Sequence, residues 1–597
     1  MKALLAPCVA LMLLAGSTPV QPADGQYRTL NDTFAPPKFT SADEWKRRAA
    51  YLRDHILATA GLLPQPRKTP LNPVIFGNLA AEGYTVSKVF FESLPGFFVT
   101  GNLYRPAGAG PFPAILSPHG HWPYGRLENS AAASVPGRAI NLARQGFVVF
   151  TYDMIGYNDS RQLSHTFGGR RENLWGLSLA GLQLWNSIRA VDFLETLPYV
   201  RRDAIGATGA SGGGTQTFLL AAVDDRIAVA APVNMISLHM QGGCLCENQP
   251  GLRLATTNVE IAGTIAPRPL LMVSATGDWT KNTMEEEYPA VRSLYALMNA
   301  ADRVYAIRID AEHNYNRSSR EAMYAWMARW LQQAPADVRR PERGFTPPPI
   351  PDALVFHQRP LPANAVTAEQ LTDNWIAAAK AQLADVPLEV RGRALAHALG
   401  LEPALDLRSA EATPTLTRTV LLTSPAPELE RLLKQDGFEI RPIAFAPFDA
   451  LAAAKIRHFE TYNRTAAAQR VADIVTAVRA APGAILIASG RDALAGLLAA
   501  ALSPVGLSVL DLGGFDTSRD EGFLEHLYVP GLRRAGDLAT AAAIAEGQLV
   551  IHNAGAGVAV ADPASESSDR TRIRVERAKL TGREIARLVR TTFRQGQ

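Results

Sequence analysis

A Gly-Ala-Ser-Gly-Gly stretch centred on Ser211 is the feature that most constrains how this chain can fold. The short apolar run before it, residues 204–208, is typical of a buried strand, and residues 215–223 after it are typical of a helix. Ser211 is therefore expected at a sharp strand-to-helix corner. Gly209 and Gly213 flank it at two residues' distance, where a side chain would collide with the neighbouring strand or helix. Such a corner presents the serine hydroxyl beside the free N–H groups of a helix N-terminus, which favour negative charge.

The rest of the first half alternates apolar strand patterns with helical patterns. Two strands of a meander are expected first, and buried strands separated by helices follow. The expected strands are residues 84–91, 97–104, 114–117, 148–153, 204–208, 227–231, 270–274 and 303–307, and the expected helices are residues 45–63, 140–144, 174–197, 215–223 and 320–331. This alternation predicts an α/β fold with a mostly parallel sheet covered by helices on both faces.

Partners for the serine are expected on loops that follow later strands. A serine hydroxyl needs a base to take its proton and an acid to orient that base. His313 follows the last strand of this half and precedes its final helix, so it is the expected base, and Asp278 follows the preceding strand and is the expected acid. His239 is the other histidine in this region, but it lies in a long loop. Asp310 and Glu312 are alternative acids, although they lie too close to the base in sequence to reach its far nitrogen easily.

Two backbone N–H groups are expected to stabilise an oxyanion. One belongs to Gly212, directly after the serine, and the other to His121, in the loop after residues 114–117. The alternative for the second position is a plain glycine turn. The histidines at 119 and 121 do not by themselves predict a metal site, because no third ligand accompanies them.

Residues 240–253 have the composition of a loop that borders a pocket. Glu247 and Arg253 from this loop, with His119 and Trp122 from the earlier loop, are candidate substrate contacts, because polar groups there can recognise hydroxyls or a carboxylate. The alternative is a solvated lid without a role in specificity.

The same loop holds Cys244 and Cys246, the only cysteines other than Cys8. A disulfide between them would close a small, strained ring, and two free thiols are the alternative. No cluster of His, Asp or Glu with ligand spacing lies near the pair in sequence, so no metal and no other cofactor are expected.

Taken together, these motifs resemble α/β-hydrolase esterases of the acetyl xylan esterase-like type, within the wider prolyl oligopeptidase group. The resemblance covers roughly residues 40–335 and rests on residues 91–93, 99–104, 118–122, 208–216, 241–248 and 277–280. It implies an α/β-hydrolase fold whose strand-to-helix corner is a nucleophile elbow, with a triad of Ser211, Asp278 and His313. It also implies hydrolysis of an acyl or methyl ester on a plant or algal polysaccharide.

The second half contains another α/β pattern. After a catalytic domain at residues 24–335, the Pro-rich residues 336–365 are expected to be a linker and residues 366–597 a second domain, with strands that include residues 420–423, 485–488 and 549–552. This domain looks like a degenerate copy of the first. An offset of 280 residues places Arg491 where the first copy has Ser211, and no acid or later histidine stands at the remaining positions. A non-catalytic, α/β-hydrolase-like domain is predicted, which braces the first domain or covers part of its cleft.

The N-terminus has the features of a signal peptide at residues 1–23. A basic start precedes an apolar run at residues 3–15, and small residues follow, with suitable cleavage points after Ser17 or Ala23. An exported, periplasmic or extracellular protein is therefore expected. No other stretch reaches eighteen apolar residues, so no membrane attachment is expected after cleavage. A formal net charge of only +4 over 597 residues gives no indication of nucleic-acid binding.

The leading functional hypothesis is an exported serine carboxylesterase that acts on a small ester or a carbohydrate ester. A serine peptidase of the prolyl oligopeptidase kind would use the same triad, but fewer than one hundred mature residues precede His119, too few for the propeller that such enzymes usually carry. A carbohydrate-binding protein with a vestigial triad is the third hypothesis, and the intact serine, acid and base argue against it.

Overall fold

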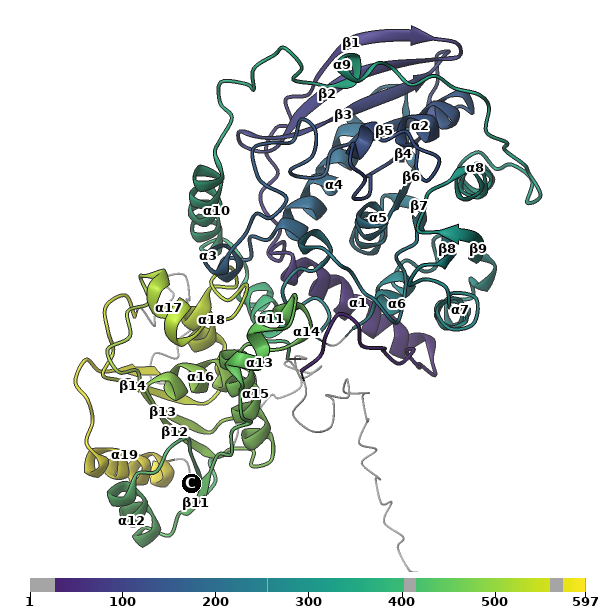
Figure 1. Ribbon diagram of the computed structural model, residues 1–597. Helices are drawn as coiled ribbons and strands as arrows, with labels where there is room; N and C mark the ends of the chain where they lie inside the picture. Colours follow the sequence, from purple (N-terminus) through teal and green to yellow (C-terminus); the bar gives the residue numbers. More distant parts are fainter. Residues whose placement is uncertain (1–26, 255, 402–414, 559–572, 596–597) are drawn as a thin grey trace, which may run out of the picture.

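The structure is a computed structural model that describes residues 27–254, 256–401, 415–558 and 573–595. Figure 1 shows two bodies, a larger one built on a nine-stranded sheet and a smaller one built on a six-stranded sheet. The signal peptide expected at residues 1–23 lies outside the described residues. Among the helices that are described, none combines the length and the apolar character that crossing a bilayer requires.

The larger sheet has the strand order β1-β2-β3-β5-β4-β6-β7-β8-β9. Strands β1 to β3 are antiparallel, β3 also pairs antiparallel with β5, and all later neighbours are parallel. The bounds are β1 (Val74–Ala81), β2 (Tyr84–Leu94), β3 (Phe97–Pro106), β4 (Phe112–Leu116), β5 (Val148–Tyr152), β6 (Val200–Ala210), β7 (Ile227–Val233), β8 (Leu270–Gly277) and β9 (Val304–Glu312). The α/β-hydrolase fold expected from the sequence is confirmed.

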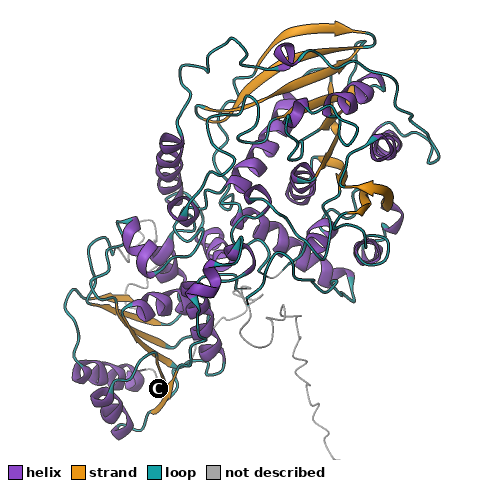
Figure 2. Cartoon of the chain, in the orientation of Figure 1, coloured by secondary structure: helices purple, strands orange, loops and turns teal. Residues whose placement is uncertain are grey.

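Helices cover both faces of this sheet (Figure 2). One face packs against α2 (Val135–Arg144) and α8 (Arg317–Leu331). The other face packs against α1 (Ala42–Thr59), α4 (Leu179–Thr196), α5 (Gly212–Val223), α6 (Asn258–Gly263) and α7 (Glu287–Leu297). The single helix expected over residues 174–197 is divided, because α3 (Arg170–Leu174) ends before Ser178, whose side chain caps α4 by accepting from the N–H of Gly181.

The smaller sheet is parallel throughout, with the order β11-β10-β12-β13-β14-β15. Its strands are β10 (Thr419–Leu422), β11 (Glu439–Pro442), β12 (Ile485–Ser489), β13 (Leu507–Asp511), β14 (Gln548–His552) and β15 (Ile573–Val575). One face packs against α11 (Leu388–Ala398), α15 (Ala466–Arg479), α16 (Arg491–Ala500) and α18 (Asp537–Ile544), and the other against α12 (Pro427–Gln435) and α19 (Gly582–Gln595). The strand order repeats that of β5-β4-β6-β7-β8-β9 in the larger sheet.

A strand-to-helix corner recurs in the smaller sheet, but one residue earlier than the sequence offset indicates. Gly490, not Arg491, adopts the backbone conformation of Ser211, with φ 60° and ψ −131° against φ 57° and ψ −126°. The N–H of Gly490 donates to the carbonyl at the end of the next strand, Asp511, as the N–H of Ser211 donates to Val233. The elbow position of the second unit therefore carries no side chain that could act as a nucleophile.

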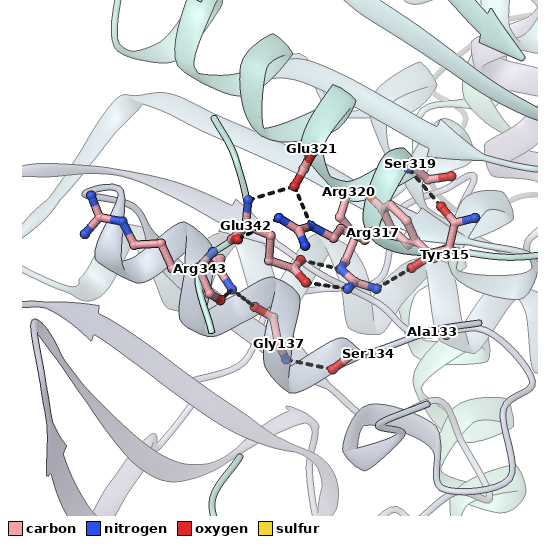
Figure 3. Close-up of polar contacts among 12 residues, drawn as sticks. Ala133, Ser134, Gly137, Tyr315, Arg317, Ser319, Arg320, Glu321, Glu342 and Arg343 are labelled. Atoms are coloured by element: carbon pink, nitrogen blue, oxygen red, sulfur yellow. Dashed lines mark hydrogen bonds and ion pairs between the residues drawn. The ribbon is translucent and has the colours of Figure 1, made fainter. Parts of the chain in front are cut away.

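The Pro-rich residues 336–365 form a strap along the first unit instead of a free linker. In Figure 1 this strap leaves α8, passes β1 with the short helix α9 (Ile350–Ala353), and continues to α10 (Ala368–Leu383). Figure 3 shows how its start is held, with Glu342 paired to Arg320 of α8 through two hydrogen bonds of 2.6 Å. The N–H of Arg343 also donates to Asn141 of α2 at 2.8 Å.

Further along, the strap completes a buried polar cluster of the first unit. Arg126 pairs with Asp153 and Asp159, and it also donates to the carbonyl of Ala353 at 3.0 Å. The Asp159 carboxylate accepts from the N–H of Val355 at 2.8 Å. Because charged groups buried at this depth require partners, release of the strap would leave polar groups unsatisfied.

The core of the first unit also extends past the domain boundary expected at residue 366. Helix α10 contributes Leu371, Trp375 and Ile376 to the same apolar cluster that contains β2 to β6. The buried Arg534 of the second unit donates to the carbonyls of Gly61 and Pro64 at 3.1 and 2.5 Å. The two units therefore pack against each other, and a chain cut within the strap would remove part of the first core.

The strap generates a stability prediction. Glu342→Ala leaves Arg320, whose side chain is 5% exposed, without its carboxylate, so we expect a loss of about 3 kcal/mol in the free energy of unfolding. The control is Lys46→Ala, which removes an exposed pair with Asp43 away from the strap, at a position that is 59% exposed, and should cost less than about 1 kcal/mol. Urea unfolding measures both. A loss for Glu342→Ala as small as that of the control would show that the strap contact does not contribute to stability.

Candidate active site

Ser211 occupies a strained corner between β6 and α5. Its φ of 57° lies in the left-handed region that non-glycine residues rarely adopt, at a cost of about 1–3 kcal/mol. The backbone is held on both sides, because the N–H of Ser211 donates to Val233 at 3.1 Å and its carbonyl accepts from Thr215 at 2.9 Å. The surrounding hydrogen bonds thus impose the conformation that turns the serine away from the sheet.

The glycines around the serine are required by close backbone approaches. A Cβ atom at Gly209 would lie 2.6 Å from the carbonyl oxygens of Gly213 and Pro118, and one at Gly120 would lie 2.7 Å from the oxygen of Ala210. The corner therefore packs directly against the loop of residues 118–122. This is the collision that the sequence pattern predicts on both sides of the serine.

His313 and Asp278 meet at the same edge of the sheet, after β9 and β8. The His313 Nδ1 atom lies 2.9 Å from Oδ2 of Asp278, whose side chain is 2% exposed. The other carboxylate oxygen accepts from the N–H of Thr280 at 2.7 Å and from its hydroxyl at 2.5 Å. The carboxylate is therefore fixed in place and orients the imidazole.

The second nitrogen of His313 is not engaged by the described residues. Its Nε2 atom is buried and has no hydrogen-bond partner within the described part of the chain. The ring contacts two indoles, with centroid distances of 5.9 Å to Trp122 and 4.5 Å to Trp279. Both Nε1 of Trp122 and Cβ of Ser211 lie 3.1 Å from the position of a Cβ at Gly120, so one small region contains the serine, this indole and the histidine.

The alternative acid and base have other partners. Asp310 accepts from the hydroxyl of Thr276 at 2.8 Å on an exposed part of the sheet edge. His239 contacts Glu286 at 2.8 Å and Asn282 at 2.8 Å. The geometry therefore favours Asp278 and His313 over both.

The two segments that carry the expected oxyanion donors, the start of α5 and the loop of residues 118–122, meet beside the serine. Helix α5 begins at Gly212, so the N–H groups of its first turn have no acceptor within the helix. A Cβ at Gly212 would lie 2.7 Å from Cε1 of His121, which places the loop of residues 118–122 over the start of this helix.

Of the four candidate substrate contacts, only Trp122 is partly exposed next to the expected base. His119 is 1% exposed, and both ring nitrogens are occupied: Nε2 accepts from the N–H of Met154 at 2.9 Å and Nδ1 donates to Gly120 at 2.7 Å. Burial lowers the pKa of His119 to about 3, so the ring is neutral, in agreement with one donating and one accepting nitrogen. His119 therefore supports the loop and has no nitrogen free for a ligand.

Glu247 and Arg253 also serve the protein rather than a ligand. Arg253 is fully buried and donates to the carbonyl oxygens of Glu247 and Gln241 at 2.8 and 2.7 Å. The Glu247 carboxylate accepts from the N–H groups of Gly243 and Cys244 at 2.7 and 3.0 Å. Both side chains shape the loop, which corrects the expectation that they contact substrate.

One cluster near the site was missed by the sequence analysis. Cys244 and Cys246 are free thiols, and the fold brings His121 and His165 to them, so that four ligand-type atoms lie within 4.8 Å of one another. The sequence predicts no metal site because no cluster with ligand spacing lies near the cysteine pair, but the fold brings two histidines to it. No spacing signal could have revealed the cluster, because His165 lies 79 residues before Cys244.

Comparison with known proteins agrees with this architecture. Residues 96–334 match the family described as X-Pro dipeptidyl-peptidase (S15 family). YtaP of Bacillus subtilis (strain 168), which is named as a hydrolase, is 27% identical over 263 residues, covering 40% of this chain and 84% of that protein.

Solved structures that are similar include the methylesterase BT1017, with 28% identity and a TM-score of 0.48 over 58% of this chain and 78% of that chain. A glucuronoyl esterase from Solibacter usitatus shows 18% identity and a TM-score of 0.38 over 51% of this chain and 99% of that chain. The family match, the relative named as a hydrolase and the strand order of the larger sheet identify the chain as a hydrolase of the α/β-hydrolase type, as its resemblance to esterase-like α/β-hydrolases implies.

The site generates a prediction about the acid and the base. Asp278→Asn should lower hydrolytic kcat less than His313→Ala, because the carboxylate only orients and stabilises the imidazolium. Steady-state kinetics on a chromogenic ester measure both, with Asp310→Asn as the matched control that should leave kcat within about twofold. A silent Asp278→Asn combined with a severe Asp310→Asn would assign the acid to Asp310 instead.

Proposed function

We propose that this protein is an exported serine esterase that removes acetyl, methyl or other acyl ester groups from a polysaccharide or oligosaccharide. The observation that carries the proposal is the hydrogen bond from His313 to the buried Asp278 beside the strained elbow of Ser211. A serine, an imidazole with one nitrogen unpartnered among the described residues and an orienting carboxylate are the parts that acyl transfer requires.

In the proposed reaction, the Ser211 hydroxyl attacks the ester carbonyl while Nε2 of His313 takes its proton. The N–H groups of Gly212 and His121 donate to the oxyanion that forms. The imidazolium then protonates the departing alcohol and leaves an acyl-enzyme. Water, activated by the same histidine, releases the acid and restores the serine. The reaction needs no cofactor.

Aromatic surface beside the expected base supports a sugar-ester substrate. Trp122 and Trp279 are both partly exposed and both rings contact the ring of His313. Flat, amphipathic rings of this kind give a large contact area to a sugar ring near the scissile ester. Nε1 of Trp279 is buried without a partner among the described residues and is a further hydrogen-bond donor on this aromatic surface.

The second unit is proposed to wall part of the cleft. Its short helix α14 (Phe459–Tyr462) pairs with the loop that borders the site, because the N–H of Arg253 donates to Thr461 at 2.9 Å and the Tyr462 hydroxyl donates to Asn248 at 3.0 Å. A hollow of about 280 Å³ lies between this loop and the second unit. Its lining includes Phe167, Leu245, Pro250, His458 and Phe459. The second unit has a glycine, Gly490, at its strand-to-helix corner, and this supports a non-catalytic role for the unit.

A peptidase is the second candidate, and the family matched by residues 96–334 is the observation that favours it. The triad would be the same, so only the substrate distinguishes the two activities. A peptide anilide therefore belongs beside the esters in any screen.

The function generates a direct test with Ser211→Ala. We expect this variant to lose at least about 10³-fold in kcat, leaving only what the oxyanion donors support. The wild type is screened in parallel on acetyl, methyl-uronate and feruloyl sugar esters and on a peptide anilide, and turnover of at least one ester without the anilide is expected. Near-normal turnover by Ser211→Ala removes the serine from the mechanism, and turnover of the anilide alone replaces esterase by peptidase.

The proposed wall is tested with His458→Ala, which changes a residue that lines the hollow and whose Nε2 lies 3.4 Å from the carbonyl oxygen of Gly243. We expect a several-fold lower kcat/KM on an oligosaccharide ester and an unchanged value on a small acetate ester. His526→Ala, in the same unit, is the control and should leave both values unchanged. Equal losses on both substrates, or no loss on either, would contradict the wall.

A further inference from the structure

Four side chains of the types that bind metals come together next to the elbow. They come from three loops, one of which is the loop that carries the proposed oxyanion donor His121. His121 comes from the loop after β4, His165 from the loop after β5, and Cys244 and Cys246 from the loop after β7. Nε2 of His121 lies 3.1 Å from Sγ of Cys246, and Nε2 of His165 lies 3.3 Å from Sγ of Cys244. All four ligand atoms lie within 4.8 Å of one another.

These separations are close to those around a tetrahedral metal ion. Zinc bonds of about 2.3 Å to sulfur and about 2.0–2.1 Å to nitrogen place neighbouring ligand atoms roughly 3.4–3.8 Å apart. The two observed nitrogen-to-sulfur distances are slightly shorter than this range, so small side-chain shifts would accommodate the ion. Two thiolates and two imidazoles are a donor set that selects zinc over magnesium or calcium.

His165 is already oriented for coordination. Its Nδ1 atom lies 2.6 Å from the carbonyl oxygen of Ile155 and donates to it, which leaves the Nε2 lone pair facing Cys244. A backbone carbonyl on the distal nitrogen is the usual support of a metal-bound histidine, because it sets the tautomer and the ring orientation. The ring of Tyr157 packs edge-on against both histidines, at 5.0 Å from His165 and 6.4 Å from His121.

The cysteine loop is likewise shaped from outside the cluster. The Glu247 carboxylate binds the N–H groups of Gly243 and Cys244, and the short turn Leu245–Glu247 follows. This turn directs the thiols of Cys244 and Cys246 to the side on which the two histidines lie. The Cys-x-Cys spacing alone is no zinc signature. Cys246 is buried, whereas Cys244 and both histidines are partly exposed, so an ion has a route to the cluster.

We propose that His121, His165, Cys244 and Cys246 bind one zinc ion in a closed, structural site. Four protein ligands leave no open position for a substrate or a water, so the ion takes no part in the hydrolysis. Its role is to tie three loops together behind the elbow. Because the His121 ring lies against Gly212, the ion would hold the proposed oxyanion loop against the start of α5.

The test measures zinc and thiols on the purified full-length enzyme. We expect about one zinc per chain after dialysis, with both thiols protected from a thiol reagent until a chelator is added. His165→Ala and Cys246→Ser should each reduce bound zinc to near zero and lower the melting temperature. His357→Ala, at an exposed histidine, is the control and should keep the full zinc content.

Cobalt exchange supplies a readout that depends on neither activity nor folding yield. Tetrahedral Co²⁺ with two thiolates should give visible d–d bands together with thiolate-to-cobalt charge transfer, and both should disappear in Cys246→Ser. Two reactive thiols with no bound metal would overturn the proposal. A Cys244–Cys246 disulfide, seen as the absence of thiols in the native and the denatured protein, would overturn it as well.

Discussion

Close contact between the elbow and the loop of residues 118–122 is the constraint on which the site depends. Where backbone oxygens approach to within 2.6–2.7 Å of a virtual Cβ, only glycine fits, and Gly120, Gly209 and Gly213 occupy these positions. The contact brings the loop over the start of α5 and holds Ser211 in its strained conformation. The other parts of the site are arranged around this contact. They are the pair of His313 and Asp278 and the loop that carries Cys244 and Cys246.

The same corner in the second unit shows that backbone geometry and chemistry are separable. Gly490 reproduces the φ, ψ and strand-end hydrogen bond of Ser211 without strain, because glycine adopts positive φ freely. The parallel strand order is also the same. What differs is the chemistry, because the corner has no side chain and no acid and histidine were found in the sequence to accompany it, so a shared strand order does not by itself imply a shared activity.

Much of the fold and of the candidate site was predictable from local patterns. Buried strands such as β5 and β12 are continuous apolar runs, and the order of serine, acid and histidine along the chain pointed to Asp278 and His313. The exposed strand β1 was missed because it has little apolar periodicity. Proline-rich composition predicts a linker for the strap residues, because composition does not reveal that Glu342 reaches a buried arginine.

The sequence by itself determined the elements whose signals are local: the elbow glycines, the strand–helix alternation and the residue types able to catalyse acyl transfer. Only the tertiary structure decided which polar side chains face a ligand. Arg253 and His119 appeared suited to bind substrate, yet both are buried in hydrogen bonds to the loops they support. It also decided that His165 meets Cys244, because the parallel strands β5 and β7 end at the same edge of the sheet and bring the loops that follow them together.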